Sequence, residues 1–297
     1  MGRTAVLLLT VLAQCFAPVG AEPSAAGAAG AQRRVVGYVE SLGDAAEKVA
    51  ILRRGQRMPA RIWQELEEGD RIEILHEGAI LVVSNIDGSR RAFGPEVGVS
   101  EALAPGGEAP SIWQNVWEQM AQRFANLRIG EATTVIMATR GDAIVPDPVF
   151  ADAEARIASG NRPLCLAWSG GEPPYAVSIK SEDGRTLIRQ KTEDEFVKTP
   201  AVDWRPGTYR IDLSDASQTT SFKIRVVDPA SLPNTGLEGP DTSIREPLRI
   251  LTQAYALASI EDGAWALEAY QRLCPLEAQA YAPAAILAES LRMGDFF

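Results

Sequence analysis

Apolar and polar residues alternate through the part of the chain that begins at residue 35, and this pattern predicts short β-strands. The apolar runs 35–40 and 49–52 have strand length, and Ile72 and Ile74 alternate with charged neighbours. A period of two places one set of side chains on a buried face and the other set in water. We therefore expect a β-rich module at the N-terminal end.

Turn chemistry divides the stretch 69–95 into three such runs. The run 79–83 is apolar throughout and rich in β-branched residues, which suits a strand that is covered on both faces. Asp87 and Gly88 follow it, and an Asp-Gly pair between two strand-like runs is a strong hairpin signal. The order strand, turn, strand, turn, strand predicts a β-meander.

The same stretch resembles the FecR family of periplasmic sensor domains. The resemblance is carried by Gly69-Asp70, the strand Ile80 to Val83, the turn Asp87-Gly88-Ser89 and Phe93. It implies a FecR-like β domain at 35–100 that serves extracytoplasmic binding, and no catalytic residue, because its motifs mark turns. Regulators of this family signal through a membrane helix to a cytoplasmic anti-sigma segment. We expect neither here, since no apolar run of transmembrane length follows residue 21.

Residues 101–130 predict a linker followed by an amphipathic helix. Ser111 is a candidate N-cap, with Gln114 at the capping-box spacing. The apolar positions at helical spacing are Ile112, Trp113, Val116, Trp117, Met120, Phe124 and Leu127. This face either packs against the chain's own sheet or is a docking surface for a partner. Trp113, Trp117 and Phe124 are the candidate docking residues.

Short strand-like runs with turns between them fill 131–228 and predict a β-sandwich. The runs are 133–138, 164–168, 175–179, 186–188, 208–213 and 220–227, with a short helix expected within 148–159. The pieces LAWSGGEPPY and RPGTYRIDL resemble immunoglobulin-like or fibronectin-type-III-like domains of bacterial envelope proteins. That resemblance implies that Trp168 fills the core and that Tyr209 ties down a corner.

Residues 229–247 are rich in proline and predict a second linker, and residues 248–297 predict a helical tail. We expect helices at 248–258, at 264–273 and at 276–291. Pro275 should end the second helix, and the third should be interrupted or kinked near Pro283. The helix–turn–helix resembles a tetratricopeptide unit, and one unit is too few to stand alone. The tail is therefore a cap on the preceding domain or half of an oligomer contact.

Residues 1–21 have the pattern of a signal peptide. A positive residue near the start is followed by the apolar run 5–13 and by small residues ending at Ala21. Residues 22–34, rich in alanine and glycine, form a flexible lead-in. We expect export to a bacterial periplasm, with a lipid anchor at Cys15 as the alternative.

Cys165 and Cys274 are the cysteines that remain after such a cleavage. An oxidising compartment permits a disulfide between them. The alternation in 164–168 turns Cys165 away from Trp168, toward the outer side of the sandwich. A bond to Cys274 would staple the tail there, and the alternative is two free thiols.

Catalytic chemistry is not indicated. His76, the only histidine, stands at a turn with no nucleophile motif nearby. No cluster has metal-ligand spacing and no phosphate-binding loop is present, so we expect no cofactor and no metal. The acidic run 65–70 and basic pairs such as Arg53-Arg54 are interpreted as solvated. The net charge of -10 repels nucleic acid and anionic lipid.

These observations predict a mainly β protein with helical additions: a FecR-like β domain, an immunoglobulin-like β-sandwich and a short α-helical C-terminal segment. We expect a non-enzymatic sensing or adaptor protein of the periplasm that binds a protein or an envelope polymer. The alternatives are a structural component of a cell-envelope assembly and a cell-wall hydrolase.

Overall fold

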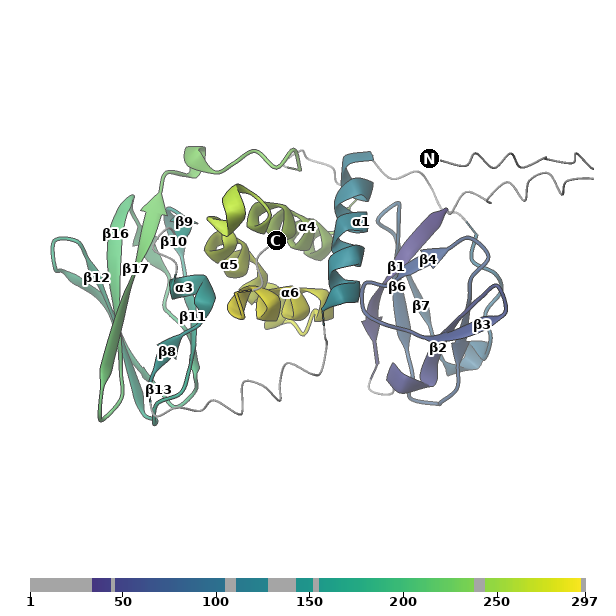
Figure 1. Ribbon diagram of the computed structural model, residues 1–297, viewed down its shortest axis with the longest axis horizontal. Coiled ribbons are helices and arrows are strands. Elements are labelled where there is room, and N and C mark those ends of the chain that lie inside the picture. Colours follow the sequence, from purple (N-terminus) through teal and green to yellow (C-terminus); the bar gives the residue numbers. More distant parts are fainter. Residues whose placement is uncertain are drawn as a thin grey trace, which may run out of the picture. The chain divides into compact units, whose positions relative to one another are not determined.

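The computed structural model describes residues 34–43, 46–104, 111–127, 143–151, 155–237 and 244–294. Residues 34–297 cluster as one compact unit. The predicted signal peptide, the lead-in and Cys15 lie outside the described residues. The fold is mainly β, with several sheets and a helical C-terminal segment (Figure 1).

The N-terminal β module consists of two sheets. Its strands are β1 (Val35–Leu42), β2 (Val49–Arg53), β3 (Gln56–Pro59), β4 (Glu65–Glu67), β5 (Arg71–Ile74), β6 (Leu81–Asn85) and β7 (Arg90–Phe93). One sheet has the order β4-β1-β6-β7 and the other the order β3-β2-β5. The apolar faces of the two sheets meet in a core that includes Val39, Ile51, Ile72 and Leu81. Burial alternates along β5, whereas β1 and β6 are buried on both faces over most of their length, as expected for the apolar run 79–83.

The predicted β-meander is wrong in one respect. The hairpin at Asp87-Gly88 joins β6 to β7 in antiparallel register, and Gly88 takes a φ of 80°. The preceding strand β5 pairs with β2, in the other sheet, and not with β6. Alternation along one strand reports which face is buried but not which strand lies beside it, so the sequence did not reveal this switch of sheet.

The second β module is a sandwich. Its elements are β8 (Val145–Pro146), α3 (Pro148–Ala151), β9 (Arg156–Ala158), β10 (Gly160–Arg162), β11 (Cys165–Ser169), β12 (Tyr175–Ser181), β13 (Thr186–Thr192), β14 (Phe196–Lys198), β15 (Val202–Trp204), β16 (Gly207–Ser214) and β17 (Thr219–Val227). A five-stranded sheet, β13-β12-β16-β17-β9, opposes a three-stranded sheet, β14-β11-β8. The helix expected within 148–159 is confined to α3, and β9 follows it. The predicted strand 133–138 lies outside the described residues.

The sandwich is immunoglobulin-like in its strand order and in its corner. Strands β12, β16 and β17 follow the order of the C, F and G strands, and β11 and β14 take the places of B and E. Tyr209, near the start of β16, donates its hydroxyl to the carbonyl of Arg205 at 2.9 Å and accepts from the Arg205 N–H at 3.2 Å. This is the predicted tyrosine corner. Trp168 is buried in the core as expected, although it stands on β11 and not on the C strand.

The helical part comprises α1 (Ser111–Asn126), α4 (Glu246–Ala258), α5 (Ala266–Glu277) and α6 (Ala282–Arg292). Pro275 does not end α5, which continues for two residues beyond it and buries Leu276. The predicted helix 276–291 is interrupted, since α5 ends at Glu277 and α6 begins at Ala282. Pro283 lies in the first turn of α6, where the missing N–H costs no helical hydrogen bond. Among the described residues, no helix combines the length and the apolar composition that a membrane crossing needs.

The tail helices pack against both β modules. Helix α5 contacts β9 and α3 of the sandwich, α6 contacts β1 of the N-terminal module, and α4 contacts α1 (Figure 1). One continuous core runs through the sandwich, the tail and α1, and it includes Tyr38 and Trp63 of the N-terminal module. Of the two roles expected for the tail, this packing is that of a cap.

Candidate functional site

The three candidate docking residues lie in the core. Trp113, Trp117 and Phe124 are 3%, 1% and 3% exposed. The Trp63 ring lies beside Phe124, and the Trp117 ring meets Tyr38 edge-on. These side chains pack against the chain itself, so the docking interpretation of this helix face is corrected. Its apolar stripe was the signal of a buried helix.

Two hydrogen bonds fix the same helix in place. The indole nitrogen of Trp63 donates to the carbonyl of Trp117 at 3.3 Å, and the indole nitrogen of Trp117 donates to Thr252 Oγ1 at 3.0 Å. Trp63 belongs to the N-terminal β module and Thr252 to α4. Helix α1 therefore joins that module to the tail, and we call this contact the N-terminal junction.

Charged groups add to the N-terminal junction. Glu40 of β1 is 1% exposed, and its Oε2 accepts from Ser84 Oγ at 2.7 Å and from an Arg245 guanidinium nitrogen at 2.7 Å. Arg90 approaches the same oxygen at 3.5 Å. A buried carboxylate needs such partners, because burial alone disfavours its charge. Arg245 immediately precedes α4, so this cluster fixes the start of the tail.

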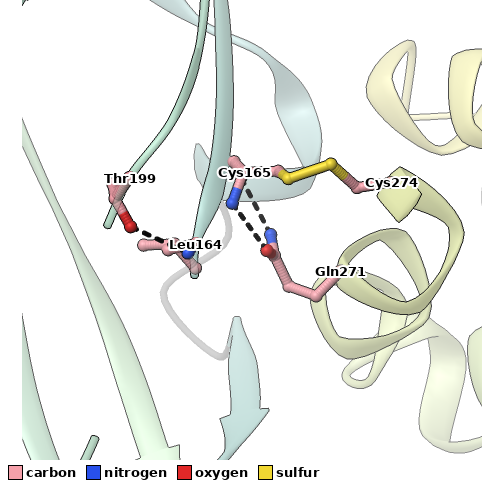
Figure 2. The surroundings of a disulfide bond; sticks show 5 residues. All are labelled: Leu164, Cys165, Thr199, Gln271 and Cys274. Atoms are coloured by element: carbon pink, nitrogen blue, oxygen red, sulfur yellow. Dashed lines mark hydrogen bonds between the residues drawn. A yellow bond between two sulfur atoms is a disulfide. The ribbon is translucent and has the colours of Figure 1, made fainter. Parts of the chain in front are cut away.

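A disulfide joins the tail to the sandwich. Cys165 of β11 and Cys274 of α5 are bonded, with their Cα atoms 6.6 Å apart (Figure 2). Both residues are buried. Cys165 lies on the face of β11 opposite Trp168, and that outer face is the one covered by α5. We call this second contact the sandwich junction.

The side-chain amide of Gln271 in α5 makes two hydrogen bonds to the backbone of β11 at the sandwich junction. Its Oε1 accepts from the Cys165 N–H at 2.8 Å, and its Nε2 donates to the Cys165 carbonyl at 2.9 Å (Figure 2). On the other edge of the strand, the Thr199 hydroxyl oxygen accepts a hydrogen bond from the N–H of the neighbouring Leu164. The amide of one side chain thus supplies both hydrogen bonds that an adjacent strand would make.

Glu268 is the buried charge of the sandwich junction. Its carboxylate accepts from Arg162 at 3.1 Å, from Arg272 at 3.0 Å and from the Ala158 N–H at 3.0 Å. Burial acts to raise the pKa of Glu268, but the hydrogen bond and charge of Arg162, with Arg272 and the Ala158 N–H, outweigh it and lower that pKa. Glu268 is therefore ionised and holds α5 against β9 and β10.

The acidic run 65–70 is partly structural. Asp70 is 2% exposed and accepts from Arg53 at 2.7 Å and from the Glu67 N–H at 2.8 Å. Glu67 also pairs with Arg53, at 2.8 Å. The solvated interpretation of these residues is wrong, since they close the turn before β5. His76 is exposed, and its Nδ1 accepts from the Gly78 N–H at 3.2 Å, as befits a turn residue.

The described residues contain no group of three or more His, Cys, Asp or Glu side chains that could hold a metal ion. Charge gathers instead on the outer face of the five-stranded sheet of the sandwich. Along β12, β13, β16 and β17 most inner positions are apolar, and the outer positions are polar apart from Ala176. The cations at outer positions are Lys180, Arg189, Lys191, Arg210, Lys223 and Arg225. We call this surface the basic face.

Register brings the cations of the basic face together. Lys180 lies opposite Arg210, and Arg210 lies opposite Lys223, so three cations stand on three adjacent strands. Arg225 follows two residues after Lys223 on the same side of β17. Adjacent strands are about 4.8 Å apart. The result is a positive strip on a chain whose net charge is -10.

One carboxylate, Asp212, stands at the outer positions of these four strands. It pairs with Lys180 at 2.8 Å and with Arg210 at 2.6 Å, and it accepts from Ser221 Oγ at 2.8 Å. Burial acts to raise its pKa, but these hydrogen bonds lower it to about 2. Within the described part of the chain, Arg189, Lys191, Lys223 and Arg225 form no ion pair. The basic face therefore keeps cations that no carboxylate neutralises.

An open hollow of about 590 Å³ adjoins the end of the basic face. It is lined by Lys223 and Arg225, by Thr208 and Ser231 with their hydroxyl groups, and by Asp228. Neither feature was predicted from the sequence, where only the run 220–227 shows two cations at alternating positions, Lys223 and Arg225. Strand order was needed to show that these positions adjoin.

Comparison with known proteins adds little. No family model matches the chain, and no curated protein matches it. A solved structure of tandem immunoglobulin domains of titin resembles 66% of this chain over 96% of its own length, with 10% identity and a TM-score of 0.23. A score this low carries no argument. The immunoglobulin-like character of the sandwich rests on its strand order and its tyrosine corner.

Proposed function

We propose that the chain is an exported, non-enzymatic sensing or adaptor protein that binds a protein or an envelope polymer. The observation that carries the proposal is the basic face, where Arg189, Lys191, Lys223 and Arg225 are exposed and unpaired within the described residues. Cations gathered on one face of an acidic protein form a local field that attracts an anionic partner. Cations that served solubility alone would not need this grouping.

The sequence supports the compartment. The pattern of residues 1–21 is that of a signal peptide, and the FecR-like pattern of 69–93 belongs to periplasmic sensor domains. Both are part of the proposal. The Cys165–Cys274 bond fits it, because disulfides persist in oxidising compartments.

The junctions favour an adaptor over an envelope-assembly component that assembles through its tail. Such a component would need exposed apolar faces on α4, α5 and α6. Leu251, Leu273 and Leu287 of these helices are fully buried against the chain itself. Partners would instead meet the β modules, which the tail holds in fixed relation to itself.

Saturable binding that depends on the basic face tests the proposal. The chain, purified in its exported form, is immobilised and exposed to separate protein and polymer fractions of the envelope. The double variant Lys223→Glu/Arg225→Glu should lose capture of the bound fraction. The matched control Lys198→Glu/Arg205→Glu changes two exposed cations of the same sandwich that lie off the face, and it should bind like the unmodified chain. Equal capture by all three proteins, or no capture, contradicts the proposal.

A further inference from the structure

We infer that the basic face binds an acidic polysaccharide, a hydrated linear chain that bears carboxylate or phosphate groups. This inference rests on the proposed function and specifies its partner. The spacing of the cations, the side chains between them and the hollow beside them support it.

The spacing of the cations suits a polymer. Lys180, Arg210 and Lys223 cross three strands in register, and Arg225 extends the line along β17. Like charges directly opposite each other destabilise a sheet. Asp212 relieves this repulsion for Lys180 and Arg210 only. A ligand with repeated negative charges would relieve it along the whole line.

The side chains between the cations argue against a folded protein partner. They are small or carry hydroxyl groups, as in Ala176, Ser178, Ser214 and Ser221. Tight protein interfaces centre on buried aromatic and large apolar anchors. The large apolar residues that the described chain exposes lie elsewhere: Leu75, Ile80, Val99, Ile112, Val145 and Phe196. A flat surface of cations and hydroxyls instead suits a ligand that stays hydrated.

The same surface argues against nucleic acid. Single strands bind on aromatic platforms where bases stack, and the outer positions of β12, β13, β16 and β17 hold no aromatic side chain. A duplex extends beyond a patch of this size and would meet the acidic remainder of the chain.

The hollow supplies the neutral contacts that a sugar requires. Thr208 and Ser231 offer hydroxyls beside the cations Lys223 and Arg225, and Asp228 offers an acceptor for sugar hydroxyls. Cations and neutral hydrogen-bond partners thus occur together, and an acidic sugar needs both.

Titration with defined polymers tests the inference. The full exported chain is titrated by calorimetry with polygalacturonate, which bears carboxylates, with linear polyphosphate, with neutral dextran and with oligo-dT. Binding of polygalacturonate is expected. Additional binding of polyphosphate would show that phosphate can also serve as the anionic group, whereas binding of polyphosphate alone, which contains no sugar, contradicts the inference. Affinity should fall steeply between about 50 and about 200 mM salt, because binding releases counterions.

Variants locate the site. Lys223→Gln/Arg225→Gln should weaken binding of the polyanion about tenfold, the loss expected for two exposed ion contacts. The control Lys198→Gln/Arg205→Gln should bind within about twofold of the unmodified chain. Thermal unfolding of all variants checks that the sandwich is intact. Binding to oligo-dT alone, equal binding to dextran, or an unchanged affinity of the first variant overturns the inference.

The two proposals can fail separately. Suppose that a protein fraction is captured and lost in Lys223→Glu/Arg225→Glu, while neither polyanion binds. The proposed function then stands and the inference is wrong. Absence of both kinds of binding rejects both.

Discussion

The two junctions hold the same helical tail by different means. At the sandwich junction, a covalent bond, a backbone-like amide pair and a buried ion pair join α5 to β9, β10 and β11. At the N-terminal junction, edge-on and tilted aromatic contacts and the Glu40 cluster join α1 and α4 to the N-terminal module. The disulfide and the polar contacts therefore dominate the sandwich junction, and aromatic packing dominates the N-terminal junction. The two should respond to different perturbations.

The two β modules also differ in how their hydrophobic cores are connected to the tail. The N-terminal module has an interior of its own, whereas the sandwich shares one core with the tail. A module with a separate core can lose its junction and still fold. The sandwich has part of its outer surface buried by α5, so loss of its junction exposes a face that is apolar around Ala167. Changing one junction at a time should therefore show whether each β module depends on the tail for its stability.

Trp117→Ala should have the largest effect. It removes a side chain that is 1% exposed and leaves a cavity at the N-terminal junction, which costs about 3–5 kcal/mol of unfolding free energy. Denaturant unfolding measures the loss. Ile112→Ala is the matched control on the same helix, since Ile112 is 42% exposed and should cost less than about 1 kcal/mol. If Trp117→Ala lost no more stability than the control, the Trp117 side chain would not be part of the core.

Cys165→Ser/Cys274→Ser should come next. Opening a link between residues 109 apart in sequence costs about 2–5 kcal/mol, mainly because the unfolded chain gains freedom. Reductant should destabilise the unmodified chain by the same amount and leave the double variant unchanged. Hydrogen exchange should rise first in α5 and β11. If exchange rises first in α1 and β1 instead, the two junctions are not separable.

Gln271→Ala isolates the amide pair from the disulfide. It leaves a buried N–H and a buried carbonyl of Cys165 without their partners, at about 1–3 kcal/mol for each unsatisfied group. The disulfide should still form, which mass spectrometry after alkylation would show. Gln279→Ala changes an exposed glutamine just beyond α5 and should be neutral. Equal stabilities of the two variants would mean that water replaces the amide without cost.

Acid should weaken the sandwich junction by a smaller amount. The pKa of Glu268 is lower in the folded chain than its ordinary value of 4.5, so the unfolded chain binds the extra proton first. Its contribution is fully present above that ordinary value and is lost as pH falls through the lower folded pKa. Glu268→Gln lacks this contribution. The stability difference between the two chains, measured from neutral to acidic pH, should shrink as pH falls, and a constant difference would contradict the assignment.

Sequence patterns predicted the elements better than their partners. The hairpin at Asp87-Gly88 and the corner at Tyr209 follow from local chemistry, and both are present. The pairing of β5 with β2 and the position of Pro275 inside α5 depend on contacts made elsewhere in the chain. The basic face could not be predicted either, because its cations lie on four strands whose order in the sheet the sequence does not give.

The site residues show the same limit. Trp113, Trp117 and Phe124 drew attention as an apolar stripe, and an apolar stripe does not tell an internal surface from an external one. Glu40 and Glu268 gave no signal at all. A buried carboxylate is indistinguishable in sequence from a solvated one until its arginine, more than 100 residues away for Glu268 and Arg162, is placed beside it.

The link from Cys165 to α5 has a consequence for the order in which the protein can mature. The sandwich is complete in sequence by Val227, yet the residues that cover its outer strand come some 40 positions later. A polypeptide released before α5 is synthesised would leave the N–H and the carbonyl of Cys165 in β11 without the hydrogen bonds that Gln271 makes to them. The outer strand of the sandwich is therefore covered only after α5 has been synthesised, so a chain shortened before α5 would expose it to solvent.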